Sequence, residues 1–228
     1  MRLAWAQPDA VGVLLPLYEA ADGQEPEEDV TPEPTPTPVE PAQLDPALLP
    51  SGYERHTLVT FAPWNAYDFV WVPSPAWSPD GQVLVTGVHG PPLGNERPED
   101  SPAFPLVALP GDGSYSASLA ARAGMWAEPR FSPAGSELAY LQADEPLQSV
   151  NGRYRLTLMD RDGSNRRALF PPPEQPGLSA QPYTWSPDGQ QIALVNPGPE
   201  GALLLVDTAT GLAQQVTDGQ TSSPRWAP

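Results

Sequence analysis

Short runs of apolar residues recur along the chain, each directly after a tight-turn sequence. The clearest is Val83-Leu-Val85, which follows Ser78-Pro-Asp-Gly81 and is nearly all apolar, as expected of a strand buried on both faces. In such a turn, proline presets φ, aspartate caps the backbone and glycine accepts a positive φ. Leu138-Ala-Tyr140 and Ile192-Ala-Leu194 follow comparable turns. The pattern predicts antiparallel strand pairs joined by tight turns.

This unit of aromatic residue, turn and strand occurs three times and once in part. Its aromatic residues are Trp77, Phe131 and Trp185, at a constant spacing of 54 residues, and a last half-copy contains Trp226. The second copy departs from the others, because Phe131 replaces tryptophan and Ala134 replaces aspartate. Self-similarity at this period, with short strands in each unit, predicts a β-propeller or a related stacked array.

The aromatic-Ser-Pro-Asp-Gly core resembles the WD-like repeat of TolB-type β-propellers over roughly residues 75–228. The resemblance implies an all-β fold made of four-stranded antiparallel blades. It implies a function only loosely, because propellers host many unrelated activities.

The chain divides into three parts by composition and pattern. Residues 1–23 are predicted to form a partial blade with a second and a third strand, and residues 51–228 to form the β-propeller blades. Residues 24–50 hold eight prolines and seven acids, so they are predicted to be a disordered Pro/Thr/Glu-rich insertion. The alternative for this insertion is a ligand for a proline-reading module.

The two ends of the chain suggest how the blades could close. The sequence opens at a second strand, 2–5, and stops at a first strand, 223–226, so the two could pair within one split blade. That pairing predicts a closed propeller of three continuous blades and one split blade. The competing interpretation, which we prefer, is a fragment of a larger propeller, because six or more blades are the pattern in the family that this chain resembles.

Charge and composition exclude several classes of partner. The net charge is −17, and such a surface repels phosphate backbones, so we expect no nucleic-acid binding. No stretch approaches the ~20 apolar residues that span a bilayer, so no membrane insertion is expected. The chain has no cysteine, which excludes disulfides and thiolate metal sites. The protein is expected to be periplasmic or extracellular if an export signal lies outside this chain, and cytoplasmic otherwise.

No residue pattern in the chain predicts catalysis, a metal or a cofactor. His56 and His89 lack carboxylate or histidine neighbours at ligand spacing, so we interpret them as structural or solvated. The segment 160–165, Asp-Arg-Asp-Gly-Ser-Asn, resembles part of a calcium loop, but it lacks the later acidic ligand and fits a hairpin turn better. A G-x-S-x-G nucleophile motif does not occur.

The loops predict where a partner binds. In each blade the connections from strand one to two and from three to four are short, whereas the others are long, so one face carries the variable loops. The leading hypothesis is a non-catalytic scaffold that binds a protein or peptide on this loop-rich face. The candidate contacts are Trp64, Tyr67, Trp126 and Tyr183, with packing at the blade rim as the alternative.

Two other functions remain open. The repeat also resembles the gating propeller of prolyl-oligopeptidase-type serine peptidases, which would require a hydrolase domain elsewhere in the gene. A weaker alternative is glycan or small-ligand binding in the propeller mouth. The sequence leaves the oligomeric state undetermined.

Overall fold

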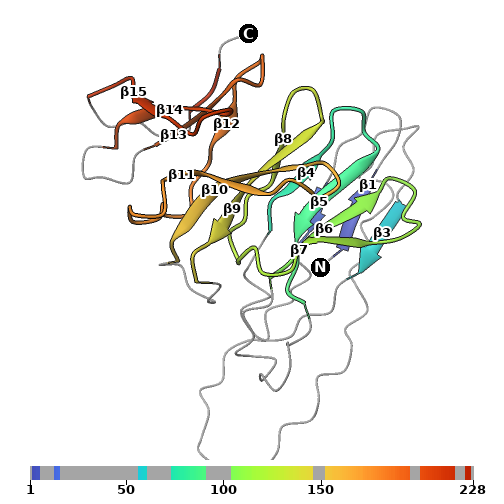
Figure 1. Ribbon diagram of the computed structural model, residues 1–228. Coiled ribbons are helices and arrows are strands. Elements are labelled where there is room, and N and C mark those ends of the chain that lie inside the picture. The colour runs from blue at the N-terminus through green and yellow to red at the C-terminus, as the bar shows by residue number, and fades with distance from the viewer. Residues whose placement is uncertain are drawn as a thin grey trace, which may run out of the picture. The chain divides into compact units, whose positions relative to one another are not determined.

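The computed structural model describes three short N-terminal strands and residues 73–90, 104–145, 152–195, 201–218 and 224–226. These residues form strands and turns without a helix, so none of them forms a helix of the length and apolarity that crossing a membrane requires. The chain separates into two compact units, residues 1–63 and 64–228. Figure 1 shows the strands of each unit.

The N-terminal unit contains one antiparallel sheet of three strands. Its strands are β1 (Arg2–Trp5), β2 (Val13–Leu15) and β3 (His56–Thr60), in the order β2-β1-β3. Both edges of β1 are therefore occupied, by β2 and by β3. Residues 224–226 form no strand. In the described residues, β3 therefore occupies the edge of β1 that the split-blade interpretation assigned to residues 223–226. This arrangement agrees with the alternative of a partial blade in an open array.

The second unit contains three sheets, and each is an antiparallel meander of four sequential strands. We call them the first, second and third blades. The first blade comprises β4 (Pro75–Trp77), β5 (Val83–Gly87), β6 (Leu106–Pro110) and β7 (Ala117–Ala120). The second comprises β8 (Arg130–Phe131), β9 (Glu137–Ala143), β10 (Tyr154–Asp160) and β11 (Arg167–Phe170). The third comprises β12 (Thr184–Trp185), β13 (Gln191–Val195), β14 (Leu203–Asp207) and β15 (Ala213–Gln215). The predicted four-stranded blades are confirmed.

The repeated turns have the structure that their sequence predicts. In the first blade, Gly81 N–H donates to the Ser78 carbonyl over 2.8 Å, and Ser78 Oγ donates to Asp80 over 2.5 Å. Gly81 has a φ of 70°, which glycine adopts without steric cost. In the second blade Ala134 replaces the aspartate, yet Gly135 N–H still donates to the Ser132 carbonyl over 2.9 Å. The turn therefore keeps its backbone bond and lacks only the carboxylate cap.

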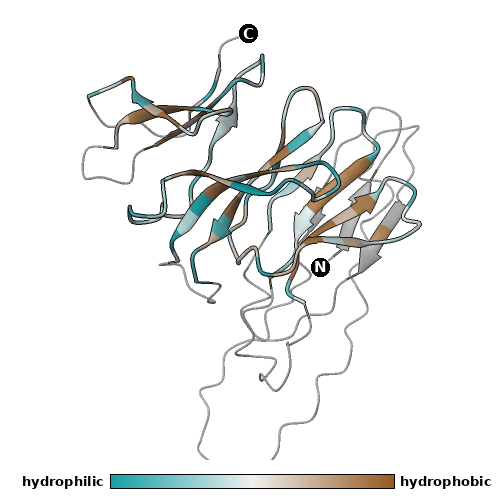
Figure 2. Ribbon diagram, viewed as in Figure 1, coloured by the Kyte–Doolittle hydropathy of each residue, from teal (hydrophilic) through white to brown (hydrophobic). Residues whose placement is uncertain are grey.

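Apolar side chains from neighbouring blades form two clusters. One joins the first and second blades through residues such as Val85, Leu106 and Tyr140. The other joins the second and third blades through residues such as Leu156, Trp185 and Ile192. Figure 2 shows the apolar residues concentrated on the strands and the polar ones on the connections. Burial of these two faces supplies the main stabilisation of the unit.

The connections fall into two classes at opposite ends of the strands. Alternate connections of an antiparallel meander lie at opposite ends, so the short β4–β5, β6–β7, β8–β9 and β10–β11 connections share one end. We call it the tight-turn end. The longer connections, including 121–129 between β7 and β8 and 171–183 between β11 and β12, lie at the other end, which we call the loop end.

Candidate functional site

At the loop end, hydrogen bonds join equivalent positions of consecutive blades. Ser74 Oγ donates to Glu128 Oε2 over 2.6 Å, and Tyr183 Oη donates to the Glu128 carbonyl oxygen over 2.6 Å. The partners are 54 and 55 residues apart, which matches the sequence repeat. Each of the three residues precedes the first strand of its own blade. Glu128 thus links the starts of all three first strands.

Glu128 has an unusual backbone conformation. Its φ is 45°, in the left-handed region that residues other than glycine rarely adopt. The hydrogen bonds from Ser74 and Tyr183 hold both its side chain and its carbonyl in place. Backbone strain that is held in this way is frequent at functional sites. The loop end therefore carries an acidic residue with a strained backbone, held in place next to the start of the second blade's first strand.

The 171–183 connection is held on β10 by the two backbone hydrogen bonds between Leu178 and Tyr154 and by the side chain of Arg155. Arg155 Nη1 donates to the carbonyl oxygens of Pro171 and Pro172 over 2.9 and 2.7 Å, and Nη2 donates to that of Gln175 over 3.0 Å. Its Nε lies 2.8 Å from Asp144 Oδ1. One guanidinium therefore holds three carbonyl groups of a connection that has no strand of its own.

The structure describes two of the four residues predicted to contact a partner. Tyr183 is only 3% exposed, and its burial raises its pKa well above the usual value. It belongs to the apolar cluster between the second and third blades. Trp126 is half-buried and packs against the apolar cluster of the second and third blades and against a small cluster of Phe104 and Met125. Trp64 and Tyr67 lie outside the described residues.

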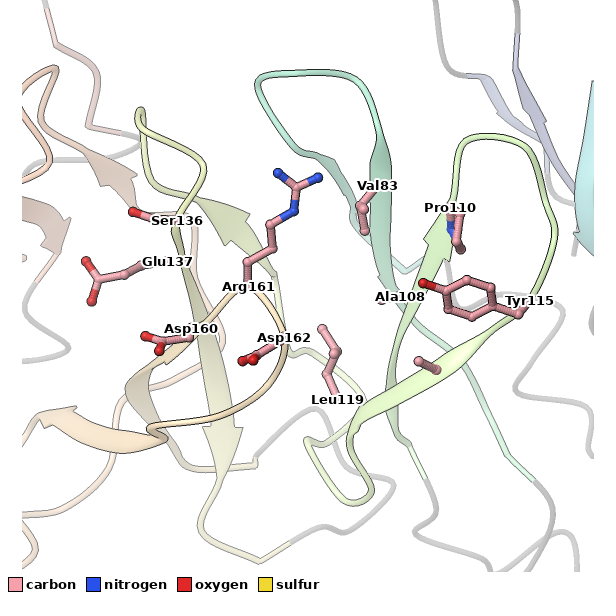
Figure 3. Close-up of a pocket in the computed structure, with 11 residues that line it drawn as sticks. Val83, Ala108, Pro110, Tyr115, Leu119, Ser136, Glu137, Asp160, Arg161 and Asp162 are labelled. Carbon is pink, nitrogen blue, oxygen red and sulfur yellow. The ribbon is translucent and has the colours of Figure 1, made fainter.

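A pocket that the sequence did not predict lies at the tight-turn end, between the first and second blades. Its volume is about 750 Å³. Figure 3 shows residues of the first blade on one side and the β10–β11 turn on the other. The apolar part of its lining comes from the first blade and consists of Val83, Ala108, Pro110, Tyr115, Ala117 and Leu119. Tyr115 is 64% exposed, and this aromatic residue in a short connection was the available sequence signal.

The polar lining of the pocket comes from the second blade. It consists of Ser136, Glu137, Asp160, Arg161 and Asp162. Two of its charges are paired, since Arg161 binds Asp80 and Arg167 Nη2 lies 3.2 Å from Glu137 Oε1. Asp160 and Asp162 form no ion pair within the part of the chain that the structure describes. The pocket therefore combines an apolar wall with a negatively charged one.

Asp80 and Arg161 connect the tight turns of the two blades. Arg161 Nη1 lies 2.6 Å from Asp80 Oδ2, and Nη2 lies 3.2 Å from Oδ1. The Arg161 guanidinium, followed by the Ser78 hydroxyl and the Gln82 amide, holds the pKa of Asp80 well below its usual range. This two-point contact fixes the position of the arginine and leaves it little capacity to bind an anion.

Other polar groups of the described residues take part in a hairpin turn and in core packing. No group of three or more histidine, cysteine, aspartate and glutamate residues able to hold a metal ion occurs among the described residues. In segment 160–165, Ser164 and Asn165 donate to the two aspartates, as in a hairpin turn. His89 is buried and stacks on Phe104 with a ring distance of 4.4 Å.

Comparison with solved structures places the chain among β-propellers. TolB from Acinetobacter baumannii is 18% identical with a TM-score of 0.50, and the match covers 74% of this chain and 37% of that one. A TolB structure from Agrobacterium tumefaciens is 17% identical with a TM-score of 0.45, and the match covers 71% of this chain and 51% of that one. The β-propeller domain of the Trilobed protease from Pyrococcus furiosus is 15% identical with a TM-score of 0.47, and the match covers 68% of this chain and 45% of that one.

The chain matches only about a third to a half of the length of these structures. No protein-family model and no curated protein sequence matches it. The three meander blades and the likeness to TolB show a TolB-like β-propeller fold, as the repeat predicted.

Proposed function

We propose that this chain is a non-catalytic β-propeller scaffold that binds a protein or peptide partner at the loop end of its blades. The supporting observation is that two irregular connections, 121–129 and 171–183, are held there by specific hydrogen bonds. Glu128 fixes the first and Arg155 the second. A surface that is ordered before binding loses less conformational entropy on association, so more of the contact energy becomes affinity.

Trp126 is the residue that this proposal places at the centre of the contact. It belongs to the 121–129 connection and is half-buried, so part of its ring is held by the protein and part remains accessible. Tryptophan is enriched among the residues that dominate binding energy in protein interfaces. A partner that covers this connection would bury the remaining surface of the ring.

The experiment is a selection of peptides from a displayed random library against the intact chain. The selected peptides are then titrated against Trp126→Ala and against Leu212→Ala. Leu212 is the matched control, because it is 73% exposed and lies in a tight turn of the third blade. Urea unfolding of both variants verifies that they fold.

We expect the selected peptides to bind Trp126→Ala at least about tenfold more weakly than the wild type. A tenfold change in Kd corresponds to about 1.4 kcal/mol of binding free energy, within the range that interface hot spots lose on substitution by alanine. Binding to Leu212→Ala should be unchanged. Peptides that are indifferent to Trp126, or that fail to be selected at all, would overturn the assignment of the loop end as the binding surface.

A further inference from the structure

We propose that the pocket between the first and second blades binds an arginine side chain from an extended segment of a partner protein. This site lies at the tight-turn end, and it does not depend on the interaction proposed for the loop end. Its two walls come from different blades, so the site exists only where the second blade packs on the first.

The size of the pocket suits a side chain together with part of a peptide backbone. Its volume of about 750 Å³ lies within the range of roughly 300–1,000 Å³ that is common for ligand sites. Val83 and Leu119 are part of its apolar wall. Such a wall can cover the methylene stem of a long basic side chain, while the charged head reaches polar groups.

Tyr115 provides an aromatic surface at the pocket. The ring comes from the β6–β7 connection, and Figure 3 shows Leu119 between this ring and Asp162. At 64% exposure, Tyr115 is one of the few large apolar side chains of the described residues that remain open to solvent. A planar guanidinium stacks favourably on such a ring, and more so when it is partly desolvated.

Asp160 and Asp162 provide the negative charge and retain free acceptors. Hydrogen bonds from Ser164 and Asn165 end on Oδ2 of Asp160 and on Oδ1 of Asp162. The other oxygen of each carboxylate receives no hydrogen bond from another residue in the described ranges. A guanidinium presents several donors in one plane, so it can bind two such oxygens together.

Charge also decides between occupants. An anion is disfavoured, because three carboxylates line the pocket and its one guanidinium is bound to Asp80. The acidic residues 24–50 of the same chain are disfavoured for the same reason. A lysine ammonium is a point charge that neither stacks in a plane nor bridges two acceptors as a fork. Arginine is the side chain that fits every wall.

The test is an NMR titration of the intact chain with blocked pentapeptides. The probe is acetyl-Gly-Ser-Arg-Ser-Gly-amide, and the comparison peptides carry lysine or the neutral isostere citrulline instead of arginine. The protein variants are Asp162→Asn and Tyr115→Leu. The asparagine keeps Oδ1 as the acceptor for Ser164, so the turn is retained while the charge is removed.

Asp207→Asn is the matched control for the charge change. Asp207 ends β14 and caps the corresponding turn of the third blade, where it accepts hydrogen bonds from Thr210. It does not line the pocket. The substitution removes one negative charge from the same class of turn, away from the proposed site.

We expect the arginine peptide to shift the signals of Tyr115 and Leu119, with weaker binding of the lysine peptide and none of the citrulline peptide. Asp162→Asn should weaken binding by about tenfold, the loss of one charge-assisted hydrogen bond. Tyr115→Leu should also weaken it, and Asp207→Asn should leave it unchanged. Absence of binding, equal binding of lysine and arginine, or equal effects of Asp162→Asn and Asp207→Asn would overturn the proposal.

Discussion

Tyr183 Oη donates a hydrogen bond of 2.6 Å to the carbonyl oxygen of Glu128, across the boundary between the second and third blades. A neighbouring bond repeats this relationship, because Trp185 Nε1 donates to the Arg130 carbonyl over 3.1 Å with the same separation of 55 residues. Two aromatic residues of the third blade therefore carry polar groups that satisfy backbone carbonyls of the second blade. The blades are joined by specific bonds as well as by apolar packing.

Removing the Tyr183 hydroxyl should destabilise the protein. Tyr183→Phe keeps the buried ring but leaves the Glu128 carbonyl without its donor, at a cost of about 1–2 kcal/mol in the free energy of unfolding. Urea denaturation measures this change. Tyr115→Phe is the control. Because Tyr115 is exposed, this substitution should change the free energy of unfolding by no more than about 0.5 kcal/mol. Equal effects of the two substitutions would contradict the role given to the Tyr183–Glu128 bond.

Restoring the missing cap in the second blade should stabilise it. Asp80 and Asp188 each accept a hydrogen bond from the serine two residues earlier and from the amide two residues later. Ala134 occupies the equivalent position and is exposed. Ala134→Asp should therefore raise the free energy of unfolding by about 0.5–1 kcal/mol. Ala134→Asn should reproduce most of the gain, and a loss of stability in both variants would refute the equivalence of the three turns.

The β14–β15 turn of the third blade leaves no room for a side chain where it meets the second blade. A Cβ on Gly211 would lie 2.5 Å from the Leu169 carbonyl oxygen, whereas a Cβ on Gly81 would meet nothing within 4 Å. The two glycines have similar φ values of 74° and 70°. Gly81→Ala should therefore lower the free energy of unfolding by about 1–2 kcal/mol, the cost of holding an alanine in the left-handed backbone conformation.

Gly211→Ala should lower the free energy of unfolding by about 1–3 kcal/mol more than Gly81→Ala does, because the second blade must also move away from the new methyl group. Thermal or urea unfolding of the pair isolates that contribution, since the φ strain is common to both variants. Matching losses in the two variants would show that the third and second blades are not packed as closely as this contact requires.

The turns and strands of the blades could be predicted because they depend on local sequence. Proline, aspartate and glycine act within four residues, and the strands follow directly. Even the second turn, with Ala134, was recognisable, because its backbone bond from Gly135 to Ser132 does not need the carboxylate. The partner of β1 was not predictable in this way, because the strand pattern does not specify which distant segment pairs with a given edge.

The binding surfaces could be predicted only in part. The sequence separates short from long connections, and this separation placed the binding hypothesis on the loop end. It does not show that the first and second blades leave a pocket lined by Tyr115 and Asp162, because that pocket depends on how two sheet faces pack. It also could not show that Tyr183 is buried, since an aromatic residue before a strand fits a core or a surface position equally well.

The ion pair between the tight turns should be visible in the titration of Asp80. Its pKa is depressed chiefly by Arg161, so Arg161→Gln should raise that pKa toward the ordinary value of 3.8. The Ser78 and Gln82 hydrogen bonds remain and should keep it somewhat lower than that value. The carboxyl carbon signal of Asp80, followed by NMR against pH, measures the change. Asp188 has no arginine among the causes of its own lowered pKa, so its titration should not move.

The sign of the pH dependence follows from the same pair. Because the folded pKa of Asp80 lies below its unfolded value, the pair contributes stability at pH above 3.8 and loses it as the pH falls below that value. The stability of the wild type should therefore fall more steeply than that of Arg161→Gln on acidification. An Asp80 that titrates identically in both proteins would show that the arginine contact does not persist in solution.

Arg155 should control the order of the 171–183 connection. Lysine cannot bind three carbonyl groups from one planar head, so Arg155→Lys should loosen this segment while leaving the blade folded. The amide of Gln175, which donates to the Pro172 carbonyl, should then exchange its hydrogen about tenfold faster or more, as expected for the loss of one charge-assisted hydrogen bond.

Arg153→Lys is the matched control for this measurement. Arg153 lies two residues away and makes one hydrogen bond to the same connection, from Nη1 to Ser179 Oγ over 2.8 Å. A lysine can replace that single bond, so exchange at Gln175 should change little. If the two variants exchange alike, Arg155 does not hold the connection, and the loop end loses the rigidity on which the proposed partner binding rests.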